Sequence, residues 1–398
     1  MKLIRGLGIS FPKGFLASGI HCGIKKRKPD IALLYSEKPC KAVAVFTQNK
    51  VKAAHIYICK KYLANQIQAI LVNSGNANCL TGKKGISDAQ AVIKEAASVL
   101  SISYKNVLIA STGVIGKFLP VDTMKKAIPR LAKNLSKNKR KFAKAILTTD
   151  KCTKQAAAEI IISGKSVRIG ATAKGAGMIQ PNMATMLCFI TTDADIDKKA
   201  MKKAIKKATE PFNHISVDGD MSTNDSVFLF ANAQAENNTI KEGTAEFDKF
   251  CIALSKITEY LSKKIILDGE GATKFVEIVV TGAVSDDSAF RMAQHISNSP
   301  LVKTSFYGHD PNFGRIAAAL GSSGEEVDQD KIDIYIGRYK VAQNGVPVNI
   351  DENKLNVLYD KKDIFIKVNL NLGKGKSKYY TCDLSNGYIN TNARYIKG

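Results

Sequence analysis

The chain has 398 residues, of which 45% are hydrophobic, and a formal net charge of +24. This length predicts two or three lobes with a large core. The charge comes mostly from lysines spread along the chain without interleaved aromatic residues, which favours solvated faces over a nucleic-acid interface. The eight cysteines form no C-x-x-C pair, which argues against a zinc site. With no leader and no bilayer-length apolar run, we expect a reduced cytoplasmic protein with no membrane or nucleic-acid partner.

The first part of the chain predicts strands that end in polar loops. Strands are expected at 31–35, 42–46, 68–72 and 106–110. The third is followed by Asn-Ser-Gly-Asn-Ala-Asn and the fourth by Ser-Thr-Gly-Val-Ile-Gly, and both loops suit left-handed backbone positions. Between them, Ser87 with Gln90 forms a capping box, which predicts that a helix starts there.

The basic stretch 121–146 predicts a helical region, and 159–163 with 166–170 predicts a hairpin. The next segment, 174–188, joins a loop rich in Gly and Pro to an apolar run that favours a buried strand. Thr185 stands at the start of that run. A threonine there would suit a nucleophile that is made by cutting the chain in front of it.

Downstream, Asp195 or Asp197 is expected to cap a helix, followed by a strand at 226–230 and a helix at 245–264. A turn at 267–273 then leads into a strand at 274–280 and a helix near 285–298, and the last 70 residues predict strands and hairpins. Residues 373–377 lack the spacing of a phosphate-binding loop, so we expect a hairpin there.

Threonine needs a base before it can act as a nucleophile. An N-terminal threonine supplies one itself, because its α-amine has a pKa of about 7.7–8.0. This requires scission of the Ala184–Thr185 bond, which attack of the Thr185 hydroxyl on the Ala184 carbonyl would start. Thr112 and Gly113 could supply a hydroxyl and a backbone N–H to an oxyanion, although the local sequence alone favours an ordinary turn. Lys174 and Glu270 could hold the charged groups of an amino-acid substrate or simply be exposed.

Taken together, these motifs closely resemble the ornithine acetyltransferase (ArgJ) family of arginine biosynthesis, nearly end to end. The motifs that carry the resemblance are 73–78, 111–116, 148–150, 174–187, 218–225, 268–271 and 310–315. The resemblance implies an α/β fold with layers in the order helix, sheet, sheet, helix. It also implies cleavage into an α fragment, 1–184, and a β fragment, 185–398, which stay associated as a heterotetramer of two α and two β chains.

The implied reaction moves an acetyl group from N-acetylornithine to glutamate by way of an acetyl-threonine on Thr185. The implied oxyanion hole is Thr112 with Gly113, and no metal or cofactor is implied. The implied substrate contacts are Thr148 (or Thr149), Lys174, Thr185, Glu270 and Asn392. Where members of the family often carry a C-terminal Ser or Thr, this chain has Lys397, which could reach a carboxylate instead.

Two alternatives stay open. Family members divide on whether acetyl-CoA also serves as a donor, which would add glutamate acetylation from acetyl-CoA. A self-cleaving aminopeptidase or amidohydrolase of related architecture would use water as the acceptor instead of glutamate.

Overall fold

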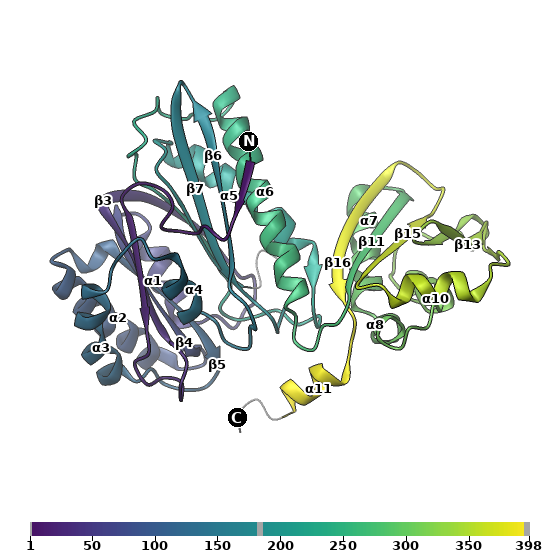
Figure 1. The fold of residues 1–398 in the computed structure, drawn as a ribbon, viewed down its shortest axis with the longest axis horizontal. Coiled ribbons are helices and arrows are strands. Elements are labelled where there is room, and N and C mark those ends of the chain that lie inside the picture. The colour runs from purple at the N-terminus through teal and green to yellow at the C-terminus, as the bar shows by residue number, and fades with distance from the viewer. Residues whose placement is uncertain (1, 181–185, 394–398) are drawn as a thin grey trace. The chain divides into compact units, whose positions relative to one another are not determined.

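The structure is a computed structural model that describes residues 2–180 and 186–393 (Figure 1). Spatial contacts divide the chain into two compact units, which are described here one at a time. The first unit comprises Met1–Gly175, Pro181–Asn213 and Met221–Ser262, and the second comprises Ala176–Gln180, His214–Asp220 and Lys263–Gly398. Two short pieces from the middle of the chain therefore belong to the second unit.

The first unit is built on one continuous set of strands in the order β1-β6-β7-β8-β10-β3-β4-β5, with β2 paired to β3. Its strands are β1 (Lys2–Arg5), β2 (Phe15–Ile20), β3 (Ile31–Phe46), β4 (Ile67–Asn76), β5 (Val107–Val114), β6 (Lys154–Ile162), β7 (Lys165–Lys174), β8 (Leu187–Thr192) and β10 (Ser226–Ala231). Its helices are α1 (Ala54–Tyr62), α2 (Gly82–Leu100), η1 (Tyr104–Asn106), α3 (Val121–Lys133), α4 (Lys139–Ala145), α5 (Lys198–Asn213) and most of α6 (Ala245–Leu267).

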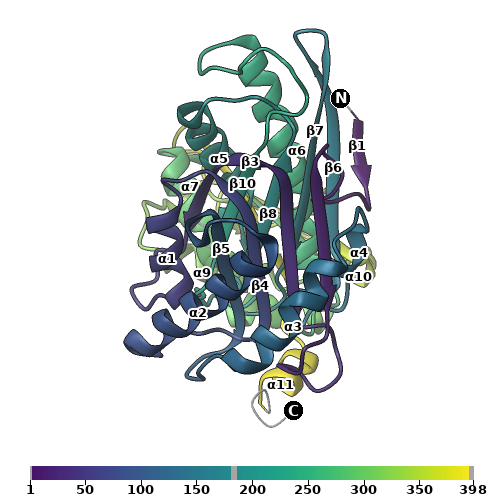
Figure 2. The same cartoon turned by 90° about the vertical axis from the view of Figure 1, so that its left-hand side faces the viewer.

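The long strand β3 connects the two parts of the sheet in the first unit. The sequence predicts two strands here, but one strand of 16 residues runs through both. A register shift between Tyr35 and Cys40 divides it, so that its first half pairs with β2 and β4 and its second half with β10. Helices α1 and α2 pack on β5, while α5 packs on β3 and β10 (Figure 2). The predicted layered α/β architecture is confirmed.

Two helix predictions are wrong in their boundaries. Helix α2 already begins at Gly82, and the Ser87 hydroxyl donates to the Lys84 carbonyl inside the helix, so Ser87 is not a cap. The first turn is held by polar contacts instead, because the Asn78 side-chain amide donates to the Gly85 carbonyl at 2.8 Å and the Gly85 N–H donates to the Thr81 carbonyl at 3.1 Å. The region 121–146 is two helices, because the chain leaves helical geometry at Asn134 and restarts after the Asn138 cap.

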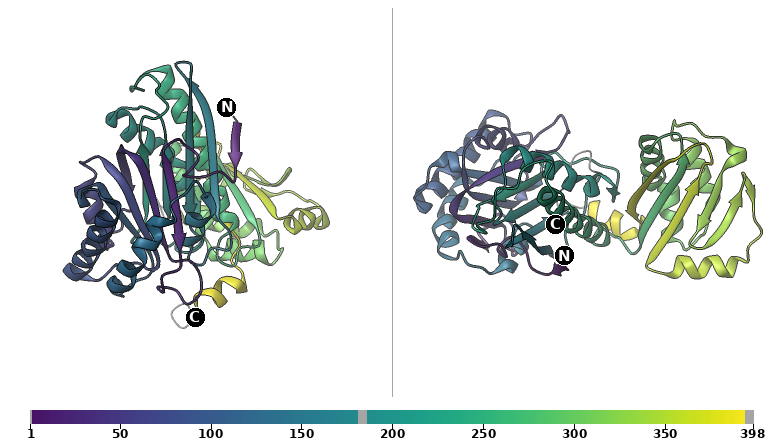
Figure 3. Two further views of the ribbon diagram at one scale, coloured as in Figure 1. Left: turned by 60° about the vertical axis from the view of Figure 1, so that its left-hand side comes forward. Right: turned by 90° about the horizontal axis from the view of Figure 1, so that it is seen from above.

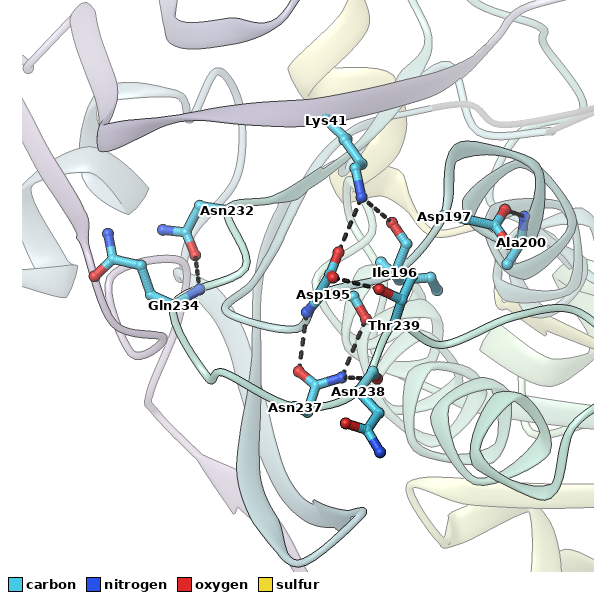
Figure 4. A network of polar contacts seen from close by, with 10 residues as sticks. All are labelled: Lys41, Asp195, Ile196, Asp197, Ala200, Asn232, Gln234, Asn237, Asn238 and Thr239. Atoms are coloured by element: carbon cyan, nitrogen blue, oxygen red, sulfur yellow. Dashed lines mark hydrogen bonds and ion pairs between the residues drawn. The ribbon is translucent and has the colours of Figure 1, made fainter.

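The segment after β8 is held in place by polar contacts (Figure 4). Asn237 accepts the Asp195 N–H at 2.9 Å and donates to the Asp195 carbonyl at 3.1 Å. Lys41 Nζ donates to the Asp195 carboxylate at 2.9 Å. Of the two predicted caps, Asp197 is the one used, since its Oδ1 accepts the Ala200 N–H at 2.7 Å.

The second unit is built on a sheet in the order β14-β13-β12-β15-β11-β16-β9 (Figure 3). Its strands are β9 (Ile215–Ser216), β11 (Phe275–Ala283), β12 (Asp333–Ile336), β13 (Tyr339–Gln343), β14 (Val346–Pro347), β15 (Asp363–Asn369) and β16 (Gly375–Cys382). Its helices are α7 (Asp286–Asn298), α8 (Pro300–Tyr307), α9 (Phe313–Gly321), η2 (Gln329–Lys331), α10 (Glu352–Asp360) and α11 (Asn386–Asn392).

The hairpin predicted at 373–377 is wrong. Strands β15 and β16 do not pair with each other, because both pair with β11, one on each side of it. Helix α7 covers β11 and β16. The apolar residues that alternate along β11, Val276, Ile278 and Val280, are fully buried under it.

Candidate active site

The predicted oxyanion turn lies where two parallel strands end side by side. In the register of β4 and β5, Ser74 pairs with Thr112 and Gly75 pairs with Gly113. Gly113 has φ +134°, and a Cβ on it would lie 2.3 Å from the Gly75 carbonyl carbon. Because no larger residue fits there, the close approach of the two strands requires this glycine. The side chain of Thr112 is buried at the same turn.

Lys174 and Thr112 are brought together, as the resemblance implies. Lys174 is the last residue of β7 and is 8% exposed. Its Nζ donates to Thr112 Oγ1 at 3.3 Å, and its backbone pairs with Leu187, the first residue of β8. Thr185 and Ala184, just ahead of β8, lie outside the described residues.

The start of β10 links β8 to the oxyanion strand. The Ser226 N–H donates to the Met186 carbonyl at 2.9 Å. The side-chain amide of Asn224 donates to the carbonyls of Ser111 and Ala77, both at 2.7 Å. These bonds join β8, the strand that follows Thr185 in sequence, to β5, the strand that carries Thr112.

Thr148 is held by a buried carboxylate that the sequence did not single out. Asp150 Oδ2 accepts the Thr148 N–H at 3.0 Å, and Oδ1 accepts the Lys154 Nζ and the Gly175 N–H, each at 2.7 Å. Burial alone would raise the pKa of Asp150, but the charges of Lys174 and Lys154 outweigh it and hold that pKa below its ordinary value. The Asp150 carboxylate thus accepts hydrogen bonds both from Thr148 and from Gly175, the residue that follows β7.

A second buried acid, Asp225, has the opposite electrostatics. Burial raises its pKa well above the ordinary value, although a hydrogen bond with Ser222 and the charge of Lys174 both act to lower it. Its Oδ2 has no hydrogen-bond partner among the described residues. The pKa values of two carboxyl groups near the same lysine are therefore shifted in opposite directions, as often occurs in sites that move protons.

The second unit brings together two more of the implied substrate contacts. Glu270 is 7% exposed, and its Oε2 accepts a hydrogen bond from Asn392 Nδ2 at 2.7 Å. Its N–H donates to the Ala176 carbonyl at 2.8 Å, and a Cβ on Gly177 would lie 2.3 Å from the Glu270 carboxyl carbon. Gly177 is therefore a position where the backbone must approach the carboxylate closely. Lys397 lies outside the described residues.

Sequence reasoning missed Asp150 as an organising residue, together with Lys154, Lys25 and Asp225. Asp150 and Asp225 belong to the motifs 148–150 and 218–225 that carry the family resemblance, but nothing in the sequence indicated that they are buried or which groups they contact. Within the ranges 2–180 and 186–393, no group of three His, Cys, Asp or Glu side chains is placed to hold a metal ion, and no helix is long and apolar enough to cross a bilayer.

Comparison with known proteins decides the family. The model of the ArgJ family matches residues 16–397. The chain belongs to the ArgJ family. An arginine biosynthesis bifunctional protein ArgJ from Shouchella clausii is 46% identical over 99% of this chain and 97% of its own length. Another, from Caldanaerobacter subterraneus subsp. tengcongensis, is 45% identical over 99% of this chain and 100% of its own length.

An ArgJ protein of Bacillus halodurans has a solved crystal structure that can be compared directly. That chain is 44% identical, with a TM-score of 0.51, and the match covers 52% of this chain and 99% of the solved one. The solved ArgJ chain is therefore about half as long as the chain described here.

Proposed function

We propose that this ArgJ protein is an acetyltransferase of arginine biosynthesis that moves the acetyl group from N2-acetylornithine to glutamate. The observation that carries the proposal is the contact of Lys174 Nζ with the Thr112 hydroxyl at a strand end where Gly113 has no room for a side chain. The relatives that match over nearly the whole chain, named arginine biosynthesis bifunctional proteins, support the same assignment.

The chemistry takes two acyl transfers. The Thr185 hydroxyl attacks the acetyl carbonyl of N-acetylornithine and passes its proton to the Thr185 α-amine. The tetrahedral oxyanion is stabilised by the Thr112 hydroxyl and the Gly113 N–H, and ornithine then leaves with the proton. The α-amine of glutamate attacks the acetyl-threonine in the second transfer, which yields N-acetylglutamate and restores the free hydroxyl. No cofactor is needed, because the donor already carries the acetyl group.

The base in this scheme exists only after the chain is cut between Ala184 and Thr185. The Bacillus halodurans chain is about half as long as this one, which supports an enzyme made of two chains, and we propose that these are 1–184 and 185–398. We further propose that two copies of each fragment form a heterotetramer in the cytoplasm. Thr148, Lys174, Glu270, Asn392 and Lys397 are the proposed substrate contacts.

A denaturing gel with N-terminal sequencing tests the cleavage. We expect two bands, the second beginning Thr-Met-Leu-Cys-Phe, and a single uncut band for Thr185→Ala. An uncut wild-type chain with full turnover would overturn the proposal.

Product analysis separates the proposed reaction from its alternatives. Purified protein is given N-acetylornithine with and without glutamate. We expect steady ornithine release only when glutamate is present, with one N-acetylglutamate formed per ornithine. Equal release in both tubes would identify a hydrolase, and N-acetylglutamate formation from acetyl-CoA and glutamate alone would show the second donor.

A further inference from the structure

Within the first unit, the short loop Leu147–Asp150, which connects α4 to β6, is held by a buried ion pair. The side chains of Asp150 and Lys154 are both 0% exposed, with 2.7 Å between Oδ1 and Nζ. The same Oδ1 accepts the Gly175 N–H, while Oδ2 accepts the Thr148 N–H. One carboxylate thus connects three stretches of chain: the loop itself, the start of β6 and the end of β7.

Stability alone does not explain why such a pair is buried. Removing two charges from water is costly, and replacing a buried ion pair by apolar residues of similar volume is often neutral or stabilising. What an apolar pair could not do is accept two backbone N–H groups from separate segments. Those N–H groups belong to Thr148 and to Gly175, which directly follows Lys174.

We propose that Asp150 is a positioning residue of the acetyl-transfer site, whose carboxylate fixes Thr148 relative to Lys174 and so sets the width of the substrate site in the first unit. The proposal rests on the proposed function, because that function makes Thr148 and Lys174 substrate contacts.

A second lysine holds the other end of the same loop. Lys25 Nζ donates to the Leu147 carbonyl at 2.9 Å. The stem of Lys25 packs on Gly75, where a Cβ would lie 2.9 Å from Lys25 Cγ, and Gly75 pairs with Gly113 of the oxyanion turn. A shift of the loop would therefore displace the oxyanion turn as well as Lys174.

The decisive variants change Asp150 without leaving the buried Lys154 ammonium unpaired. The double variant Asp150→Asn/Lys154→Met replaces both charged side chains by neutral ones of similar volume. The Asn side chain has only one acceptor oxygen, so its NH₂ group must face one of the two backbone N–H donors, Thr148 or Gly175. We expect a folded, cleaved protein whose kcat/KM for N-acetylornithine is about 100-fold lower, the loss that a misplacement of about 1 Å causes. KM should rise more than kcat falls, because binding contacts move while Thr185 and the oxyanion turn remain.

Asp150→Glu keeps the charge and moves it by one methylene. A purely structural ion pair would tolerate this change, so we expect intact folding and cleavage but a kcat/KM reduced at least 10-fold. This variant decides the question if the double variant does not fold.

Asp88→Asn is the matched control, because Lys84 and Asp88 form another ion pair four residues apart, on α2, with side chains that are 58% and 10% exposed. It should leave kcat/KM unchanged. Rates are normalised to cleaved protein on a gel, and thermal melting confirms folding. A folded Asp150 variant with wild-type kcat/KM would overturn this inference alone, whereas an inactive wild-type protein would overturn the proposed function instead.

Discussion

At the scale of single residues, the site depends on positions where one chemical group cannot be exchanged. Gly113 cannot carry a side chain because Gly75 lies against it, and Thr112 presents a hydroxyl that already accepts a hydrogen bond from Lys174. A threonine with that partner can turn its own proton toward a developing oxyanion. The pKa values of the two buried acids, Asp150 and Asp225, are shifted in opposite directions, because only Asp150 accepts hydrogen bonds from Lys154 and from backbone N–H groups.

Thr112→Ala removes the hydroxyl of the proposed oxyanion hole. We expect kcat to fall by about 10²–10³-fold with little change in KM, because the hydroxyl acts mainly on the transition state. Steady-state kinetics with N-acetylornithine and glutamate measure this. Thr112→Ser, which keeps the hydroxyl, should recover most of the rate, and an equally slow Ser variant would contradict the assignment.

Asp225→Asn tests the raised pKa of this buried acid through stability. Because the folded state raises the pKa of Asp225, it holds the proton more tightly than the unfolded chain does, and this contribution is lost as pH rises above about 4. The free energy of unfolding of the Asn variant relative to wild type should therefore increase with pH, by at most about 1.4 kcal/mol per pH unit. Urea denaturation at pH 5 and pH 8 checks this, and a difference that stays constant would show that Asp225 is ionised.

At the scale of elements, the β6–β7 hairpin carries Lys174 to the site. Its two-residue turn has Ser163 at φ +49° and Gly164 at φ +77°, which is the pattern of a type I′ turn. The turn sets the register along which Lys154 pairs with Ala173 at the far end. The turn chemistry therefore helps to place both Lys154 and Lys174.

Gly164→Ala should reduce the free energy of unfolding by about 1 kcal/mol, because a Cβ disfavours the left-handed backbone. Nothing lies within 4 Å of a Cβ at this position, so backbone strain is the only cause. Ser163→Asn should have the opposite sign, since Asn-Gly is the preferred pair in this turn. Denaturant midpoints measure both, and equal effects of the two variants would contradict this description of the turn.

At the scale of the whole molecule, the net charge of +24 comes mostly from lysines spread along the chain. Such a charge destabilises the compact state through self-repulsion, which salt screens. We expect the urea midpoint to rise between 20 and 500 mM NaCl. A midpoint that falls would mean that attractive ion pairs dominate over the repulsion.

The sequence alone was sufficient for the family, the α/β class and most strands, whereas the roles of the predicted site residues stay predictions. Motifs such as Ser111–Gly116 and Lys174–Leu187 encode local backbone needs, glycine for close approach and an apolar run for a buried strand, and these can be predicted without tertiary information. Helix starts and strand partners were predicted less well, as Ser87 and the 373–377 segment illustrate, because contacts with residues outside the element and pairing with distant strands outweigh local signals.

Only the tertiary structure decided how the buried charges are shared. Asp150 meets the N–H of Gly175 across 25 residues of sequence, and Lys25 reaches Leu147 across 122. Such contacts depend on sheet register and on which groups lose their water. Local sequence determines neither the register nor the desolvation, because both arise from the packing of segments that meet only in the folded chain.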